Sequence, residues 1–136
     1  MKFLKAKRAI ETLEAAITFP IAILVMLATV NLGMVVYGQQ AVQAAARHGA
    51  RMGSVAQQGS ACYAVTEARG AIQTAAIVQN PDVTILAPGG RAGTILKIRV
   101  TGQVPNFFGG LGAIFPGLSD GPFQLQAEAT FRQEGW

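Results

Sequence analysis

The side chains that could do chemistry are few, and two of them lie beside a long uncharged stretch. Glu11 and Glu14 separate a basic start from a run, Ala15 to Ala46, that carries no charge. A carboxylate in the first turn of a helix is stabilised by the helix dipole by about 0.3–1 kcal/mol. In a low-dielectric setting it could instead attract a cation far more strongly than in water. Glu14 is therefore either the polar rim of an anchor or a charge with a partner.

The remaining reactive side chains predict neither a catalytic nor a metal site. The chain has one histidine, His48, and one cysteine, Cys62, so no intrachain disulfide can form. A zinc site of the usual composition needs a second histidine or a cysteine pair. No phosphate-loop, nucleophile-elbow or H-E-x-x-H spacing is present. We therefore expect no enzyme activity, cofactor, metal or small-molecule substrate.

The composition is typical of a membrane protein with a small appended domain. Charged residues make up 13% of the 136 residues and hydrophobic residues 51%. Four of the eleven basic residues lie in the first eight positions, and the others form no stripe with interleaved aromatics. This distribution argues against nucleic-acid binding and is better explained by membrane topology.

A transmembrane helix is predicted over residues 15–37. As a helix these 23 residues span about 35 Å, against a hydrocarbon core of about 30 Å. A removable signal peptide is the main alternative, but its apolar region rarely exceeds about 15 residues. The basic residues before the span predict that residues 1–14 are cytoplasmic and that the rest lies outside. Asn31, deep in the span, is expected to face another helix.

The helix is expected to continue beyond the membrane over residues 38–59. Ala41, Ala45, Gly49 and Gly53 repeat at four-residue spacing and form one stripe of small side chains. Such a stripe lets another helix approach closely. Alternatively, the two glycines fray the end of the helix, at about 1 kcal/mol each relative to alanine.

Residues 60–136 are predicted to form an extracytoplasmic α+β domain. A second helix is expected to begin with Ser60 as its N-cap and to end at Asn80-Pro81. Alternating side chains then predict strands over 83–87, 94–104 and 123–132. Together they would form a small three-stranded antiparallel sheet, with one face covered by the second helix and one face in water. The side chains expected to face inward on the two long strands are Leu96, Ile98, Val100 and Val104, and Phe123, Leu125, Ala127, Ala129 and Phe131.

The connection over residues 105–122 is unusually apolar for a loop. It carries Phe107, Phe108, Leu111, Ile114 and Phe115. Two interpretations remain open. The loop folds back under the sheet or onto the first helix, or it forms a patch for a partner subunit or the membrane interface.

Several motifs along the chain resemble the TadE family of tight-adherence (Flp-type) pilus proteins. The family begins R-G-A-A-x-V-E-F-A-L-x-x-P, and Arg8, Glu14, Ala16 and Pro20 match it here. "YGQQAVQAAARHGAR" (37–51) is similar to the family pattern Y-x-x-x-x-x-x-x-A-A-R-x-G-A-R. The closing "LQAEATFRQE" also resembles the last strand of these proteins.

The resemblance implies a minor pilin or pseudopilin-like assembly protein of the bacterial inner membrane. Its partners would be other pilus-assembly subunits, together with the lipid bilayer. Processed members are cut by a prepilin peptidase after a glycine, and here the corresponding junction is Ala9–Ile10. Cleavage there would make Glu14 the fifth mature residue, where pilin-like proteins carry a register-setting acid. The alternative is an unprocessed single-span accessory subunit of a larger membrane complex.

Overall fold

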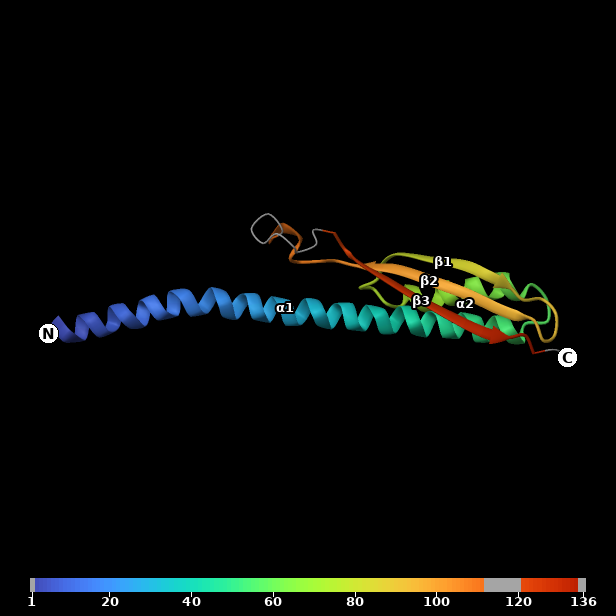
Figure 1. Cartoon of the computed structure of the whole chain (residues 1–136), viewed down its shortest axis with the longest axis horizontal. Coiled ribbons are helices and arrows are strands. Elements are labelled where there is room, and N and C mark those ends of the chain that lie inside the picture. Colours follow the sequence, from blue (N-terminus) through green and yellow to red (C-terminus); the bar gives the residue numbers. More distant parts are fainter. Residues whose placement is uncertain (1, 112–120, 135–136) are drawn as a thin grey trace. The chain divides into compact units, whose positions relative to one another are not determined.

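A computed structural model describes the backbone of residues 2–111 and 121–134 and the side chains of residues 11–110 and 121–134. The chain divides into two compact units, Met1–Gly33 and Met34–Trp136. Helix α1 (Lys2–Val55) runs from the first unit into the second (Figure 1). Residues 38–55, the helical part of the predicted extension over 38–59, therefore belong to the second unit.

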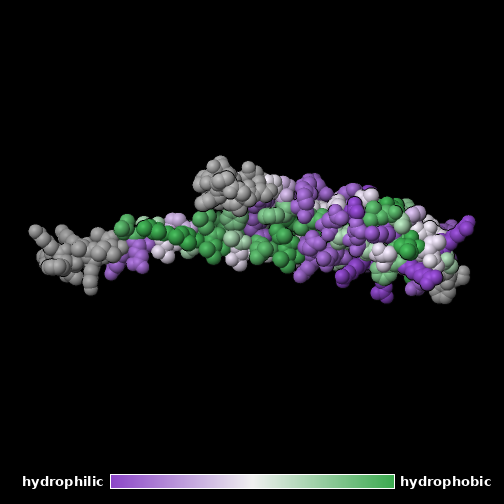
Figure 2. Space-filling model, viewed as in Figure 1, coloured by the Kyte–Doolittle hydropathy of each residue, from purple (hydrophilic) through white to green (hydrophobic). Residues whose placement is uncertain are grey.

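Unit 1 consists of the first part of α1, and its side chains are unusually apolar and exposed. Every side chain from Glu11 to Val30 is exposed. Figure 2 shows hydrophobic surface along much of this part of α1. From Glu11 to Val55, α1 is long and apolar enough to cross a membrane. Exposed side chains of this kind need surroundings as apolar as themselves, which lipid supplies.

Unit 2 contains a three-stranded antiparallel sheet with the order β1-β2-β3. The strands are β1 (Gln79–Pro88), β2 (Ile95–Val104) and β3 (Phe123–Arg132). The central strand β2 pairs with both neighbours, so that Val100 lies between Val83 of β1 and Ala127 of β3 (Figure 1). The predicted α+β architecture is confirmed.

The alternation of side chains along β2 separates a buried face from a wet one, as the sequence predicts. Leu96, Ile98, Val100 and Val104 are all 0% exposed. On the opposite face Glu128 forms ion pairs with Lys97 at 2.6 Å and Arg99 at 2.6 Å. These hydrogen bonds, from Lys97 first and Arg99 second, hold the pKa of the Glu128 carboxyl below its usual value.

One face of the sheet is covered by α2 (Ser60–Gln73) and by the part of α1 that belongs to unit 2 (Figure 1). Helix α2 buries Ala64, Ala68 and Ile72, which recur at four-residue spacing. From α1 come four small or medium side chains, and they complete one continuous core with the strands. They are Val42, Ala45, Ala46 and Ala50.

Two predicted boundaries around the second helix are wrong. The helix ends at Gln73 rather than at Asn80, because the chain turns there and buries Ala75 and Val78. The first strand accordingly starts at Gln79 and includes Pro81. A proline lacks an N–H, but Pro81 lies where the register of the edge strand β1 shifts between Gln79 and Asp82, so it has no partner in the ladder.

The predicted capping role of Ser60 is also wrong. Gly59 occupies the N-cap position in a left-handed conformation (φ 63°), and no side chain caps the helix. The Ser60 hydroxyl donates instead to the Pro88 carbonyl oxygen at 3.0 Å, which ties the start of α2 to the end of β1. Helix α1 ends at Val55, before the predicted break at Gly59-Ser60.

Candidate functional site

The small-residue stripe of α1 lies against α2 of the same chain. A Cβ atom added to Gly49 would lie 2.5 Å from the Ala64 carbonyl oxygen and 2.6 Å from the Ala68 Cβ. A Cβ atom added to Gly53 would lie 2.5 Å from the Ala64 Cβ. Both glycines are therefore needed for the two helix backbones to approach this closely. These two positions of the stripe are filled within unit 2, so they are not free for a partner helix.

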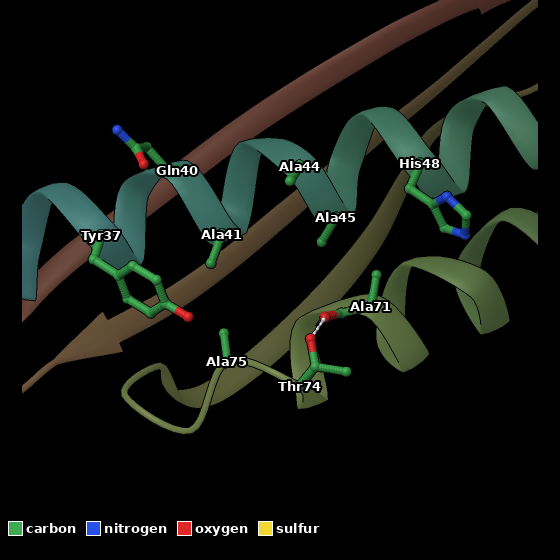
Figure 3. A pocket seen from close by; sticks show the side chains of 9 residues that line it. All are labelled: Tyr37, Gln40, Ala41, Ala44, Ala45, His48, Ala71, Thr74 and Ala75. Atoms are coloured by element: carbon green, nitrogen blue, oxygen red, sulfur yellow. Dashed lines mark hydrogen bonds between the residues drawn. The ribbon is translucent and has the colours of Figure 1, made fainter.

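Further towards the start of the stripe, the seam between α1 and α2 opens into a groove. The groove holds about 420 Å³. Ala45 is buried at its base and Ala41 is half-buried. Figure 3 shows the residues that line it. They are Tyr37, Gln40, Ala41, Ala44, Ala45 and His48 of α1, Ala71 of α2, and Thr74 and Ala75 directly after α2.

The groove owes its space to alanines that face one another from the two segments. Five of its nine lining residues are alanines, whose methyl groups are too short to fill the seam. Figure 3 shows Ala41 and Ala45 on α1 opposite Ala71 and Ala75. The lining is accordingly hydrocarbon with a few polar groups, which suits an apolar side chain better than a charged ligand.

Of the four polar side chains that line the groove, Thr74 and His48 lie within hydrogen-bond distance of another group. The Thr74 hydroxyl donates to the Ala71 carbonyl oxygen at 2.8 Å (Figure 3). His48 Nε2 lies 3.4 Å from Glu67 Oε2. Among the described residues no group of three His, Cys, Asp or Glu side chains could hold a metal ion.

A second apolar surface lies where β2 ends and β3 begins. Phe107 is 58% exposed and Phe108 is half-buried. Phe123 is 37% exposed, so the expectation that it is an inward-facing core residue is wrong. Asn106 braces this turn, because its Oδ1 accepts from the Phe108 N–H at 3.0 Å and its Nδ2 donates to the Gly121 carbonyl oxygen at 3.4 Å. The Leu111 side chain, Ile114 and Phe115 lie outside the described residues.

The predicted residues in the first part of α1 belong to a different unit from the seam. Glu14 is exposed and Asn31 is buried, and both lie in unit 1. The Ala9–Ile10 bond lies within the helical backbone of α1, and the side chains of these two residues are outside the described part.

Two glycines that matter for packing escaped the sequence interpretation. A Cβ atom on Gly38 would lie 2.7 Å from Val104 Cγ2 and 2.8 Å from Leu125 Cδ1. A Cβ atom on Gly102 would overlap Val78 Cγ1. The signal for the second was present: Gly102 occupies an inward position of an otherwise apolar alternation, which marks a close approach of another segment.

The similarity of this chain to known proteins is confined to a segment of α1. No curated protein and no solved structure shows significant similarity to the chain. The family model of TadE-like proteins matches residues 11–51. The matched segment holds the apolar part of α1 and the stripe as far as Gly49, and it stops before α2 and the sheet. The resemblance to the TadE-like proteins is thereby confirmed, and the match with the apolar helix indicates a membrane-anchored, Tad pilus-related protein.

Proposed function

We propose that this protein is a TadE-type minor pilin of a tight-adherence pilus, a structural subunit rather than an enzyme. It acts by helix packing and subunit contacts, with its N-terminus in the cytoplasm and unit 2 outside the inner membrane. The observation that carries the proposal is the family match over residues 11–51, since it coincides with the apolar part of α1.

The exposed surface of unit 1 supports an assembly role. All described side chains from Glu11 to Val30 are exposed, and among them are Leu, Ile, Val, Phe and Met. In the membrane this surface would contact lipid, and in an assembly it would contact the apolar helices of neighbouring subunits. Such contacts need no change in the fold of unit 2, whose core is closed without it.

Glu14 would set the register of neighbouring subunits once the leader is removed. Cleavage between Ala9 and Ile10 would leave a free ammonium group at Ile10, one helical turn from Glu14. An ammonium group of one subunit and the carboxylate of its neighbour attract strongly in a low-dielectric setting. A subunit out of register would leave both charges unpaired, which is strongly disfavoured.

Leader removal is tested by the intact mass of the protein purified from native membranes. Cleavage gives a chain beginning at Ile10, and Ala9→Asp should prevent it. If the wild-type protein keeps residues 1–9, the cleaved pilin is excluded. Glu14→Gln should leave the mass of the processed chain unchanged but reduce its recovery in the assembled pilus fraction. Glu11→Gln is the matched control, because Glu11 is an exposed acid one turn away.

Co-purification identifies the assembly. Detergent-solubilised membranes should yield the protein together with the secretin or ATPase of a pilus system. Recovery with an unrelated membrane complex instead, with an uncleaved leader, would contradict the minor-pilin proposal and favour the single-span accessory subunit.

A further inference from the structure

The connection between β2 and β3 lies at the end of unit 2 at which the chain enters it. Strand β2 starts beside the end of α1, since Leu96 Cδ2 is 2.7 Å from the Cβ position of Gly53. It finishes beside Gly38, whose Cβ position is 2.7 Å from Val104 Cγ2. Phe123, the first residue of β3, pairs with Val104. Phe107 and Phe123 thus lie at the same end as residues 34–38.

The turn between α2 and β1 belongs to this end too. Val78 Cγ2 is 3.7 Å from the Cβ position of Gly38, and Val78 also packs against Gly102. Four separate stretches of sequence therefore meet here. We call them together the neutral end: residues 34–46, 72–81, 101–107 and 121–127.

Within these bounds the neutral end carries no aspartate, glutamate, lysine, arginine or histidine. Asp82, which pairs with Thr101, marks its border on β1, and Asp120, next to Gly121 in the sequence, lies outside the described residues. In the described part of unit 2, all such residues fall within 47–69, 82–99 and 128–134. The polar side chains of the neutral end are mostly glutamine and asparagine, which need no counter-ion and are far less costly than charges near a bilayer. A surface that faces water everywhere normally carries charged side chains at both ends. The charges of unit 2 lie away from the neutral end, so the two ends are suited to different surroundings.

The exposed apolar side chains of the neutral end include aromatic rings. Tyr37, Phe107 and Phe123 are exposed there, beside Val36. Aromatic residues favour the boundary between lipid headgroups and hydrocarbon. Asn106 holds the Phe107 turn closed through its two hydrogen bonds, so the ring is presented from a braced loop rather than from a free chain end.

We propose that the neutral end of unit 2 docks on the lipid bilayer and inserts Phe107 and Phe123 into the headgroup layer. This contact is additional to the membrane span. The proposal rests on the proposed membrane anchoring. Residues 34–37 belong to unit 2 and directly continue the uncharged run that starts at Ala15. A span that ends near Tyr37 brings the neutral end to the level of the headgroups. Two attachments, one helix and one braced loop, then fix the orientation of unit 2 on the membrane.

Single tryptophan reporters test the contact in the full-length protein. In a Trp136→Phe background, which removes the one natural tryptophan, a tryptophan is placed at Phe107, Ile95 or Leu27. Ile95 is the matched control because it is as exposed as Phe107 (57% against 58%) but lies at the charged end, paired with Arg132. Leu27 reports on the span. Each variant is reconstituted into phosphatidylcholine–phosphatidylglycerol vesicles with or without brominated acyl chains.

We expect blue-shifted emission and loss of intensity with brominated lipid for F107W and L27W, and neither change for I95W. Quenching of L27W without quenching of F107W would overturn the docking while leaving the anchor intact. Quenching of neither would contradict the anchor itself. F107W emission could also be blue-shifted without quenching by brominated lipid, and the shift could disappear when the protein is diluted with lipid. That result would show that a second copy of the chain covers Phe107, and it would also overturn the proposal. F123W provides an independent second reporter.

Discussion

The two parts of α1 share one uncharged run, from Ala15 to Ala46, but differ in the size of their side chains. Eleven of residues 11–33 are Leu, Ile, Val, Phe or Met, and all eleven are exposed. Residues 34–55 are rich in alanine and glycine, and one face of them is buried against α2 and the sheet. The same helix therefore has an exposed apolar surface in the first part, as a membrane span requires, and is packed into folded protein in the second.

In these two parts, side-chain size indicates better than hydropathy what surrounds an apolar face of a helix. A fluid hydrocarbon phase fits around any large side chain, and the favourable free energy of transfer from water grows with the apolar area of that side chain. A protein interior is close-packed, so a neighbouring backbone can approach only where side chains are short. Gly49 and Gly53 are the clearest instances, since each lies within reach of atoms of Ala64. Four substitutions test this contrast between the two parts of α1.

The largest effect is expected for Leu96→Ala, in the core that the second part of α1 covers. Leu96 is 0% exposed, and its Cδ2 fills the space beside Gly53. Loss of the buried methyls and the cavity left behind should destabilise unit 2 by about 2–5 kcal/mol. Hydrogen exchange of β2 amides in the full chain measures this change. Leu27→Ala, in the exposed part of α1, should leave the same exchange rates unaltered; equal effects would abolish the distinction between the two parts.

Leu27→Arg addresses the other part of the helix. A charge near the middle of a span disfavours insertion by about 2.5–3.5 kcal/mol. We expect a marked fall in the fraction of chain recovered in the membrane after alkaline extraction. Val55→Arg, at the other end of α1, is the control, because Val55 is exposed and outside the predicted span. If both variants insert like the wild type, α1 does not cross a bilayer through residue 27.

Gly49→Ala tests whether α1 needs a residue without a side chain where it contacts α2. Alanine normally stabilises a helix by about 1 kcal/mol relative to glycine. At Gly49 the new methyl would meet the Ala64 carbonyl oxygen, a backbone atom that cannot rotate away, so we expect unit 2 to lose about 1–2 kcal/mol net. At Gly70 of α2 a Cβ meets nothing within 4 Å, so Gly70→Ala should be stabilising. Opposite signs in a denaturant titration would support the seam, and a stabilising Gly49→Ala would refute it.

The smallest effect concerns the wet face of the sheet, where Glu128 pairs with Lys97 and Arg99. Because Lys97 and Arg99 lower the pKa of Glu128, the folded state releases the Glu128 proton more readily than the unfolded chain. The resulting stabilisation is complete above the ordinary glutamate pKa of about 4.3 and is lost as the pH falls through the lower, folded value. Glu128→Gln should remove this part of the acid dependence of the melting temperature. An unchanged pH profile would show that the ion pairs contribute nothing.

Local patterns predicted the strands because their period is unambiguous. Leu96, Ile98 and Val100 alternate with charged or polar residues, and only one strand register buries them all. The end of α2 was harder, because Asn80-Pro81 resembles a helix stop equally well whether the helix ends there or two turns earlier. The true cause, burial of Ala75 and Val78 in the turn, is a tertiary contact that no local pattern contains.

The candidate site was predictable only in part, for a similar reason. Four-residue spacing placed Gly49 and Gly53 on one face of a helix, but spacing does not say which helix covers that face. The groove depends on Ala71 and Ala75 lying opposite Ala41 and Ala45, a juxtaposition set by how α2 docks. Asn106 likewise acquires its role only when Gly121 is brought beside it.

The residues that follow β3 affect when unit 2 can complete its fold. The Gln133 amide donates to the Ala56 carbonyl oxygen at 2.9 Å, and the Glu134 N–H donates to the Ser54 carbonyl oxygen at 3.0 Å. The end of α1 is thus satisfied by residues about eighty positions later in the chain. Contacts of such long sequence separation form late. Unit 2 therefore cannot complete these bonds until the chain has been made as far as residue 134.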